Sequence, residues 1–107
     1  EGWTSLARHR AGLHKRRGGY AEAAEIWKEW IEQAPDFSFE PYEELAKYHE
    51  HRAGDIAAAL DILARAEGRL EIARALHDHY VYREWEASLR HRKERLLRKQ
   101  QLQRREA

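Results

Sequence analysis

Seven histidines are the residues of this chain that most directly suggest chemistry, because imidazole binds metal ions and transfers protons near neutral pH. Two pairs, His49/His51 and His77/His79, are separated by two positions. On a helix this spacing places the side chains about 200° apart, so one ion cannot bind both. Position 53, four after the first of them, is alanine, which leaves no zinc-protease motif. We therefore expect no metal site, with one inward histidine per helix, such as His49 or His77, and the others in solvent.

The sequence contains no motif that indicates nucleophilic catalysis. The chain has no cysteine, and no hydroxyl residue lies in a nucleophile elbow. The hydroxyl residues other than tyrosine are Thr4, Ser5, Ser38 and Ser88. Gly18-Gly19 follows a predicted helix rather than a strand, so it does not resemble a phosphate-binding loop. Acidic pairs such as Glu43/Glu44 are typical of charged helix surfaces. We predict that the chain is not an enzyme and uses no cofactor.

Charge is distributed unevenly along the chain, although the net charge is only +1. Residues 1–19 hold five Lys/Arg and one acid, residues 20–84 hold seven and fifteen, and residues 85–107 hold eight and three. Both ends are therefore basic and the middle is acidic. We interpret this as attraction between terminal helices and the middle of the same molecule. The alternative is a basic surface that binds nucleic acid.

Composition points to a helical protein that does not enter a membrane. Ala, Leu, Glu, Arg and Lys dominate, and these are good helix formers. No apolar run approaches the length of a membrane span. The lack of cysteine fits a reducing compartment, and we expect a cytoplasmic location. The chain begins at Glu1 rather than methionine, and we expect a fragment of a larger protein.

Two segments, Gly18–Ala23 and Gly54–Ala59, superpose at a spacing of 36 residues. A period of this size is typical of stacked helical hairpins, which usually work by presenting a surface. We expect breaks between helices at Gly18-Gly19, at residues 34–40, at Gly54 and near Gly68. The expected helices cover about 4–17, 20–33, 41–52, 56–67, 70–79 and 80–104. The last two form either one long helix or two with a bend near Asp78.

These segments resemble tetratricopeptide (TPR) repeats. The first repeat matches the second-helix pattern of the family, although Trp30 stands where a small residue is usual. The second repeat matches both helices but lacks a closing proline. The matching residues are Tyr20, Ala23, Trp27 and Pro35 in the first repeat, and Tyr42, Leu45, Ala46, His49, Ala59, Leu63 and Ala66 in the second. The resemblance implies an all-α, right-handed array of antiparallel helix hairpins with five or six helices.

The same resemblance implies one domain over residues 1–107 that binds a protein or peptide partner. Repeat one would cover about 4–35, repeat two about 40–67, and capping helices about 70–104. By resemblance, the first helix of each repeat lines a concave groove. The groove residues are then Arg8, Lys15, Glu43, Lys47 and Glu50.

A narrower similarity covers Tyr42–Arg52, Gly54-Asp55, Ala59-Leu60 and parts of residues 89–99. These stretches are similar to the repeat region that follows the nuclease domain in bacterial ribonuclease H-like exonuclease-type proteins. The similarity implies a non-catalytic C-terminal module. One alternative function is then a nucleic-acid-binding accessory domain, and another is a structural domain that packs on its parent enzyme. The candidate nucleic-acid contacts are Arg90, Arg92, Lys93, Arg95, Arg98 and Lys99.

Overall fold

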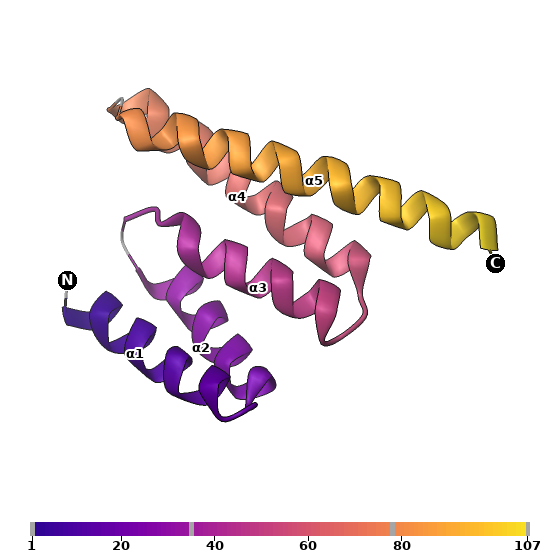
Figure 1. The fold of residues 1–107 in the computed structure, drawn as a ribbon. Coiled ribbons are helices and arrows are strands. Elements are labelled where there is room, and N and C mark those ends of the chain that lie inside the picture. Colours follow the sequence, from indigo (N-terminus) through magenta and orange to yellow (C-terminus); the bar gives the residue numbers. More distant parts are fainter. Residues whose placement is uncertain (1, 35, 78, 107) are drawn as a thin grey trace.

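In the residues that it describes, the computed structural model of the chain has five α-helices, which follow one another in space as they do in sequence (Figure 1). It describes residues 2–34, 36–77 and 79–106, and within these ranges there is no β-strand. The predicted all-helical class is therefore confirmed, and the five helices of the described residues agree with the predicted five or six. The helices are α1 (Gly2–Arg16), α2 (Tyr20–Gln33), α3 (Phe39–His51), α4 (Ile56–Leu76) and α5 (Tyr80–Glu106).

The predicted break signals explain where the first helices end. Gly18 and Gly54 adopt φ angles of +80° and +66°, in the left-handed region where glycine is favoured. The amide of Gly19 donates to the carbonyl of His14 over 2.7 Å and closes α1. Asp55 then caps α4, since its carboxylate accepts a 3.0 Å hydrogen bond from the amide of Ala58. The break expected at 34–40 is also present, although Pro35 lies outside the described residues.

The break predicted at Gly68 is wrong, because α4 continues through this residue to Leu76. Gly68 does not have a positive φ, and a glycine inside a helix costs only about 1 kcal/mol relative to alanine. Leu70, two residues after Gly68, is buried and extends the buried face of α4. The burial of its side chain outweighs the cost of the glycine. The interruption instead follows Leu76, and α5 begins at Tyr80. Asp78, where a bend was expected, lies outside the described residues.

Each helix packs on its neighbours in the chain, so α1 lies at one end of the stack and the α4–α5 pair at the other (Figure 1). The Cα atoms extend over 46 × 36 × 18 Å. The smallest extent is about two helix diameters, so the core is a thin layer between helices.

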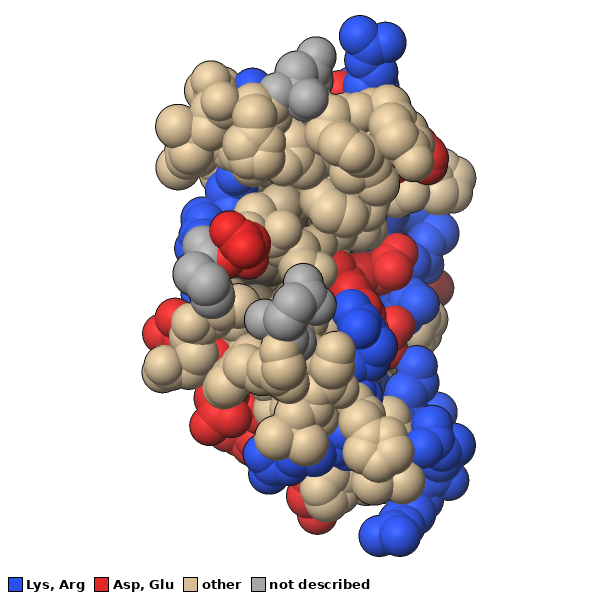
Figure 2. Space-filling view, turned by 90° about the vertical axis from the view of Figure 1, so that its left-hand side faces the viewer, with Lys and Arg blue, Asp and Glu red and all other residues tan. Residues whose placement is uncertain are grey.

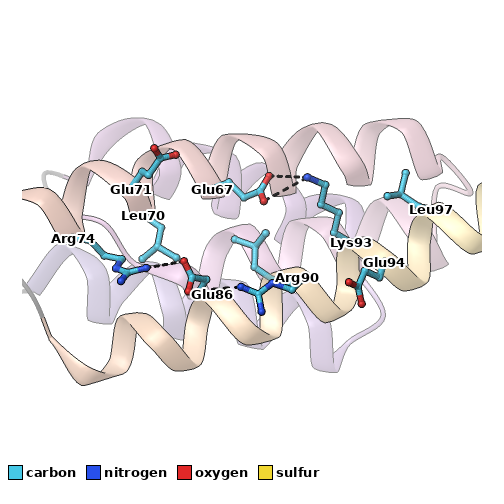
Figure 3. A pocket seen from close by; sticks show the side chains of 10 residues that line it. Glu67, Leu70, Glu71, Arg74, Glu86, Arg90, Lys93, Glu94 and Leu97 are labelled. Carbon is cyan, nitrogen blue, oxygen red and sulfur yellow. Dashed lines mark hydrogen bonds and ion pairs between the residues drawn. The ribbon is translucent and has the colours of Figure 1, made fainter.

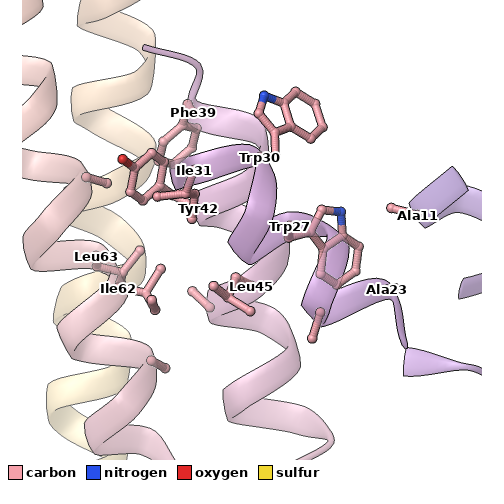
Figure 4. Packing of buried hydrophobic residues seen from close by; sticks show 14 of the residues in the cluster. Ala11, Ala23, Trp27, Trp30, Ile31, Phe39, Tyr42, Leu45, Ile62 and Leu63 are labelled. Atoms are coloured by element: carbon pink, nitrogen blue, oxygen red, sulfur yellow. The ribbon is translucent and has the colours of Figure 1, made fainter. Parts of the chain in front are cut away.

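α2 contributes two large buried residues to the core, Trp27 and Trp30. Figure 4 shows both indole rings on the side of α2 that faces Ala11 of α1. α1 meets α2 through the small residues Ala7 and Ala11, which are its buried residues. The apolar recurrence that predicted the first helix includes Trp3 and Leu6, and these remain exposed.

The buried face of α3 also differs from expectation at one position. Tyr42, Leu45 and Ala46 are buried as predicted. His49, predicted to point inward, is only partly buried, and the next residue, Glu50, is buried in its place. This change matters for the site, because Glu50 is a charged residue.

Candidate functional site

Ion pairs join α3 to the basic residues of α1. Arg8 Nε lies 2.9 Å from Glu40 Oε1, and Lys15 Nζ lies 2.8 Å from Glu44 Oε1. Lys47 Nζ, on α3 itself, lies 3.4 Å from the other carboxylate oxygen of Glu44. Two predicted groove residues, Lys15 and Lys47, therefore converge on one carboxylate. Burial favours a higher pKa for Glu44, but hydrogen bonds from Lys15 and the charge of Lys47 outweigh it and lower the pKa.

A second set of ion pairs joins α3 to α5. Arg95 binds both carboxylate oxygens of Glu50, with distances of 2.6 and 2.7 Å, and Lys99 Nζ lies 3.2 Å from Glu50 Oε2. The Glu50 side chain is 0% exposed. The hydrogen bonds from Arg95, helped by Lys99, lower the pKa of Glu50 from 4.5 to about 2 against the opposing effect of burial. We call Glu50, Arg95 and Lys99 the Glu50 clasp.

The prediction that Glu50 lines an open groove is therefore wrong. Glu50 shares the buried side of α3 with Ala46, one turn earlier, and its carboxylate is balanced by cations from α5. Glu43, another predicted groove residue, lies 3.8 Å from Arg92 of α5. Ion pairs to α1 and α5 thus occupy much of the acidic surface of α3.

Most of the predicted nucleic-acid contacts are also paired with acids. Arg90 lies 3.9 Å from Glu86, and Lys93 lies 3.2 Å from Glu67. With the pairs to Glu43 and Glu50, five of the six candidates have an acidic partner, and Arg98 has none within the described residues. In Figure 2, red and blue atoms lie side by side in the middle of the right-hand half, whereas the lower right-hand edge is blue. Acids of the middle segment therefore pair with part of the basic charge of the terminal helices.

A pocket of about 210 Å³ opens where α1, α2 and α3 meet, and we call it the α1–α3 pocket. Three aromatic residues, four basic residues and one acid line it. These are Lys15, Tyr20, Trp27, Glu44, Lys47, Tyr48, His51 and Arg52. The Arg52 guanidinium stacks on the ring of Tyr20, with Cζ 3.8 Å from the ring centroid. Sequence reasoning identified Lys15 and Lys47 but missed the aromatic wall, whose Tyr20 and Tyr48 lie at opposite ends of different helices.

A larger hollow of about 460 Å³ lies between α4 and α5, and we call it the α4–α5 groove (Figure 3). Leu70 and Leu89 are buried at its floor, and Leu97 is 43% exposed. Its cations are paired: Arg74 lies 2.7 Å from Glu86, which also approaches Arg90, and Lys93 binds Glu67. Two further acids line this groove, Glu71 and Glu94, and neither forms an ion pair within the described residues.

The histidines with recorded contacts meet residues that are close to them in the chain. Within residues 2–34, 36–77 and 79–106, no three His, Cys, Asp or Glu side chains are placed to hold a metal ion. His51 Nε2 lies 3.3 Å from Glu50 Oε1, beside the Glu50 clasp. His79 stacks on Tyr80, with ring centroids 4.6 Å apart. These contacts give the histidines local packing partners rather than a shared ligand.

Across the described part of the chain, no helix has both the length and the apolar character needed to cross a bilayer. Comparison with known proteins gives no match: no family model, no curated protein and no solved structure matches this chain. The resemblance to TPR repeats therefore remains a prediction from sequence.

Proposed function

We propose that this chain is a non-catalytic, TPR-like interaction module within a larger protein, and that it binds a peptide or protein partner through the α1–α3 pocket. The observation that carries the proposal is the composition of this pocket. Its walls combine the rings of Tyr20, Trp27 and Tyr48 with the side chains of basic residues. Ligand-binding sites typically combine aromatic or apolar walls with converging polar groups that fix the orientation of the ligand.

The charges of the pocket indicate the chemistry of the partner. Lys15, Lys47 and Arg52 bring three positive charges to the pocket, against the single carboxylate of Glu44. The two lysine side chains are 46% and 40% exposed, so their ammonium groups are able to turn toward a bound anion without disturbing the core. We therefore expect an acidic segment that also carries an aromatic or aliphatic side chain.

The nucleic-acid alternative has weaker support. The Glu50 clasp and the neighbouring pairs already engage five of the six candidate residues. What favours this alternative is the C-terminal part of α5, where Arg98, Arg104 and Arg105 are exposed and form no ion pair with another described residue. An accessory role beside a ribonuclease H-like nuclease would use this end of the helix.

The second alternative is a structural domain that packs on its parent enzyme. The observation that favours it is the tip between α4 and α5, where Ile72, Leu76 and Tyr80 are exposed. Limited proteolysis of the longer protein would test it, because a tip covered by an enzyme domain resists cleavage and an uncovered tip does not.

Selection from a phage-displayed library of random peptides tests the proposed function. We expect the chain to enrich acidic peptides that carry an aromatic or aliphatic residue. The double variant Lys47→Ala/Arg52→Ala should weaken their binding at least about tenfold, since charge-assisted hydrogen bonds contribute roughly 1.5–3 kcal/mol each. Lys28→Ala is the matched control, because Lys28 is a similarly exposed lysine that pairs with Glu25 outside the pocket. Failure to enrich any peptide, or equal binding by the double variant and the wild type, would contradict the proposal.

A further inference from the structure

The two ends of the helix stack carry complementary surfaces. Along α1, one side faces α3 and holds Arg8 and Lys15, which pair with α3. At 100° per residue, Trp3, Leu6 and Leu13 lie on the opposite flank of α1, which faces away from α3. Trp3 and Leu6 are exposed, and Leu13 is partly buried. This end of the stack therefore presents an unpartnered apolar surface.

Two arginines lie along the same flank. Arg10 follows Leu6 at a spacing of four residues on α1, and Arg17 follows Leu13 just beyond the end of this helix; both are exposed. Neither forms an ion pair with another described residue. We call Trp3, Leu6, Arg10, Leu13 and Arg17 the α1 stripe. It combines apolar side chains with two positive charges.

The α4–α5 groove, at the other end of the stack, is lined by a small excess of acids. The α4–α5 groove lies on the side of α5 away from α3, because Glu86, Arg90 and Leu97 are on the flank opposite Arg95 and Lys99. Leu97 offers exposed apolar surface, and Leu70 and Leu89 lie beneath it. The cations of the groove are bound to Glu67 and Glu86, whereas Glu71 and Glu94 have no cationic partner among the described residues. Figure 3 shows these two carboxylates apart from the dashed contacts.

We propose that the α1 stripe of one molecule docks into the α4–α5 groove of a second copy of this chain. The apolar side chains Leu6 and Trp3 would cover Leu97, and Arg10 and Arg17 would face Glu71 and Glu94. Charge complementarity selects this occupant: the groove has unpaired acids, and the stripe has unpaired arginines.

The position of the two surfaces determines the kind of assembly. They lie at opposite ends of the stack, beyond α1 on one side and beyond α4 and α5 on the other (Figure 1). Contact between two different surfaces is heterologous, so each added copy leaves one stripe and one groove free. In such an assembly, α1 of each copy packs next to α4 and α5 of the neighbouring copy, so the helix stack continues from one molecule to the next. The α1–α3 pocket lies inside each copy and stays open, so this inference does not depend on the proposed function.

Sedimentation velocity with two variants tests the inference. Leu6→Glu removes the stripe and keeps the groove, and Leu97→Glu removes the groove and keeps the stripe. Both positions are exposed, at 57% and 43%, so neither change disturbs the core. We expect the wild type to increase in mass with concentration, up to about 1 mM. Each variant alone should stay monomeric, and an equimolar mixture should form dimers and stop there.

A third variant controls for non-specific association through exposed apolar side chains. Leu102→Glu replaces another exposed leucine of α5, 58% exposed, outside the groove. It should assemble like the wild type. Association that weakens as salt rises is expected, since the paired charges are at the surface. The inference is overturned if the wild type is monomeric at all concentrations, or if Leu6→Glu or Leu97→Glu still assembles alone. It is also overturned if the mixture of these two variants stays monomeric, or if Leu102→Glu fails to assemble.

Discussion

Removing the charge of Glu50 should destabilise the fold strongly at neutral pH. The Glu50→Gln variant keeps the shape of the side chain but leaves Arg95 and Lys99 without a buried counter-charge. The difference between a pKa of 4.5 and one of about 2 corresponds to roughly 3.5 kcal/mol, at about 1.4 kcal/mol per pH unit. Arg95 and Lys99 are partly exposed, so solvent screening lowers this upper value. We expect a loss of about 2–3 kcal/mol.

The pH dependence of this loss follows from the sign of the pKa change. Folding lowers the pKa of Glu50, so between about pH 2 and 4.5 the unfolded chain binds more protons than the folded one. The stabilisation by Glu50 is therefore complete above pH 4.5 and disappears as the pH falls toward 2. Urea unfolding of both proteins, followed by circular dichroism, should show a wide gap in the free energy of unfolding at neutral pH. This gap should close across that window.

The matched control is Glu25→Gln, which removes an exposed carboxylate that pairs with Lys28 three residues away. Such surface pairs contribute about 0.5 kcal/mol or less. If Glu50→Gln costs no more than Glu25→Gln, or if the gap between Glu50→Gln and wild type is the same at pH 2 as at neutral pH, the Glu50 clasp does not hold α5 as described.

Three further results are expected. Ala59 is fully buried, so Ala59→Leu should lower the free energy of unfolding by roughly 1–3 kcal/mol through overpacking, and an unchanged melting curve would refute its place in the core. Gly68→Ala should raise the free energy of unfolding by about 0.5–1 kcal/mol, because alanine favours the helix and its Cβ meets no atom within 4 Å there. Gly54→Ala should lower the free energy of unfolding by about 1–2 kcal/mol, because Gly54 has a positive φ. Equal effects of the two substitutions in denaturant titrations would contradict this assignment. The purified chain should not cleave nucleic acid when metal ions are added, and cleavage that one carboxylate substitution abolishes would overturn the non-catalytic interpretation.

Local signals predicted most of the helix ends. Gly18 and Gly54 turn the chain with a positive φ, and Asp55 caps the helix that follows. These effects depend on a few adjacent residues, so they are readable in sequence. The prediction at Gly68 was wrong because a glycine can either end a helix or lie inside one. No cap or turn residue near Gly68 indicates which of the two applies.

The site was less predictable, because its contacts join residues far apart in the chain. Glu50 and Arg95 are separated by 45 positions, and no periodicity reveals that one carboxylate is buried against a cation on another helix. The charge distribution did anticipate the general result, since basic α1 and α5 both pair with acidic residues of α3. The buried side of α1 was not predicted, because the apolar pattern was taken from the large residues Trp3 and Leu6, which are exposed. Ala7 and Ala11 are the buried residues of α1, and they belong to the same hydrophobic cluster as the tryptophans of α2.

The central claim, that a partner binds in the α1–α3 pocket, is tested most directly by nuclear magnetic resonance. The isotope-labelled chain would be titrated with the tightest peptide from the phage selection, and the amide and indole signals followed. We predict the largest changes at Tyr20, Tyr48 and Arg52 and at the indole of Trp27, all of which line the pocket. Changes confined to α5, or to the α4–α5 groove, with these four residues unmoved, would contradict the claim.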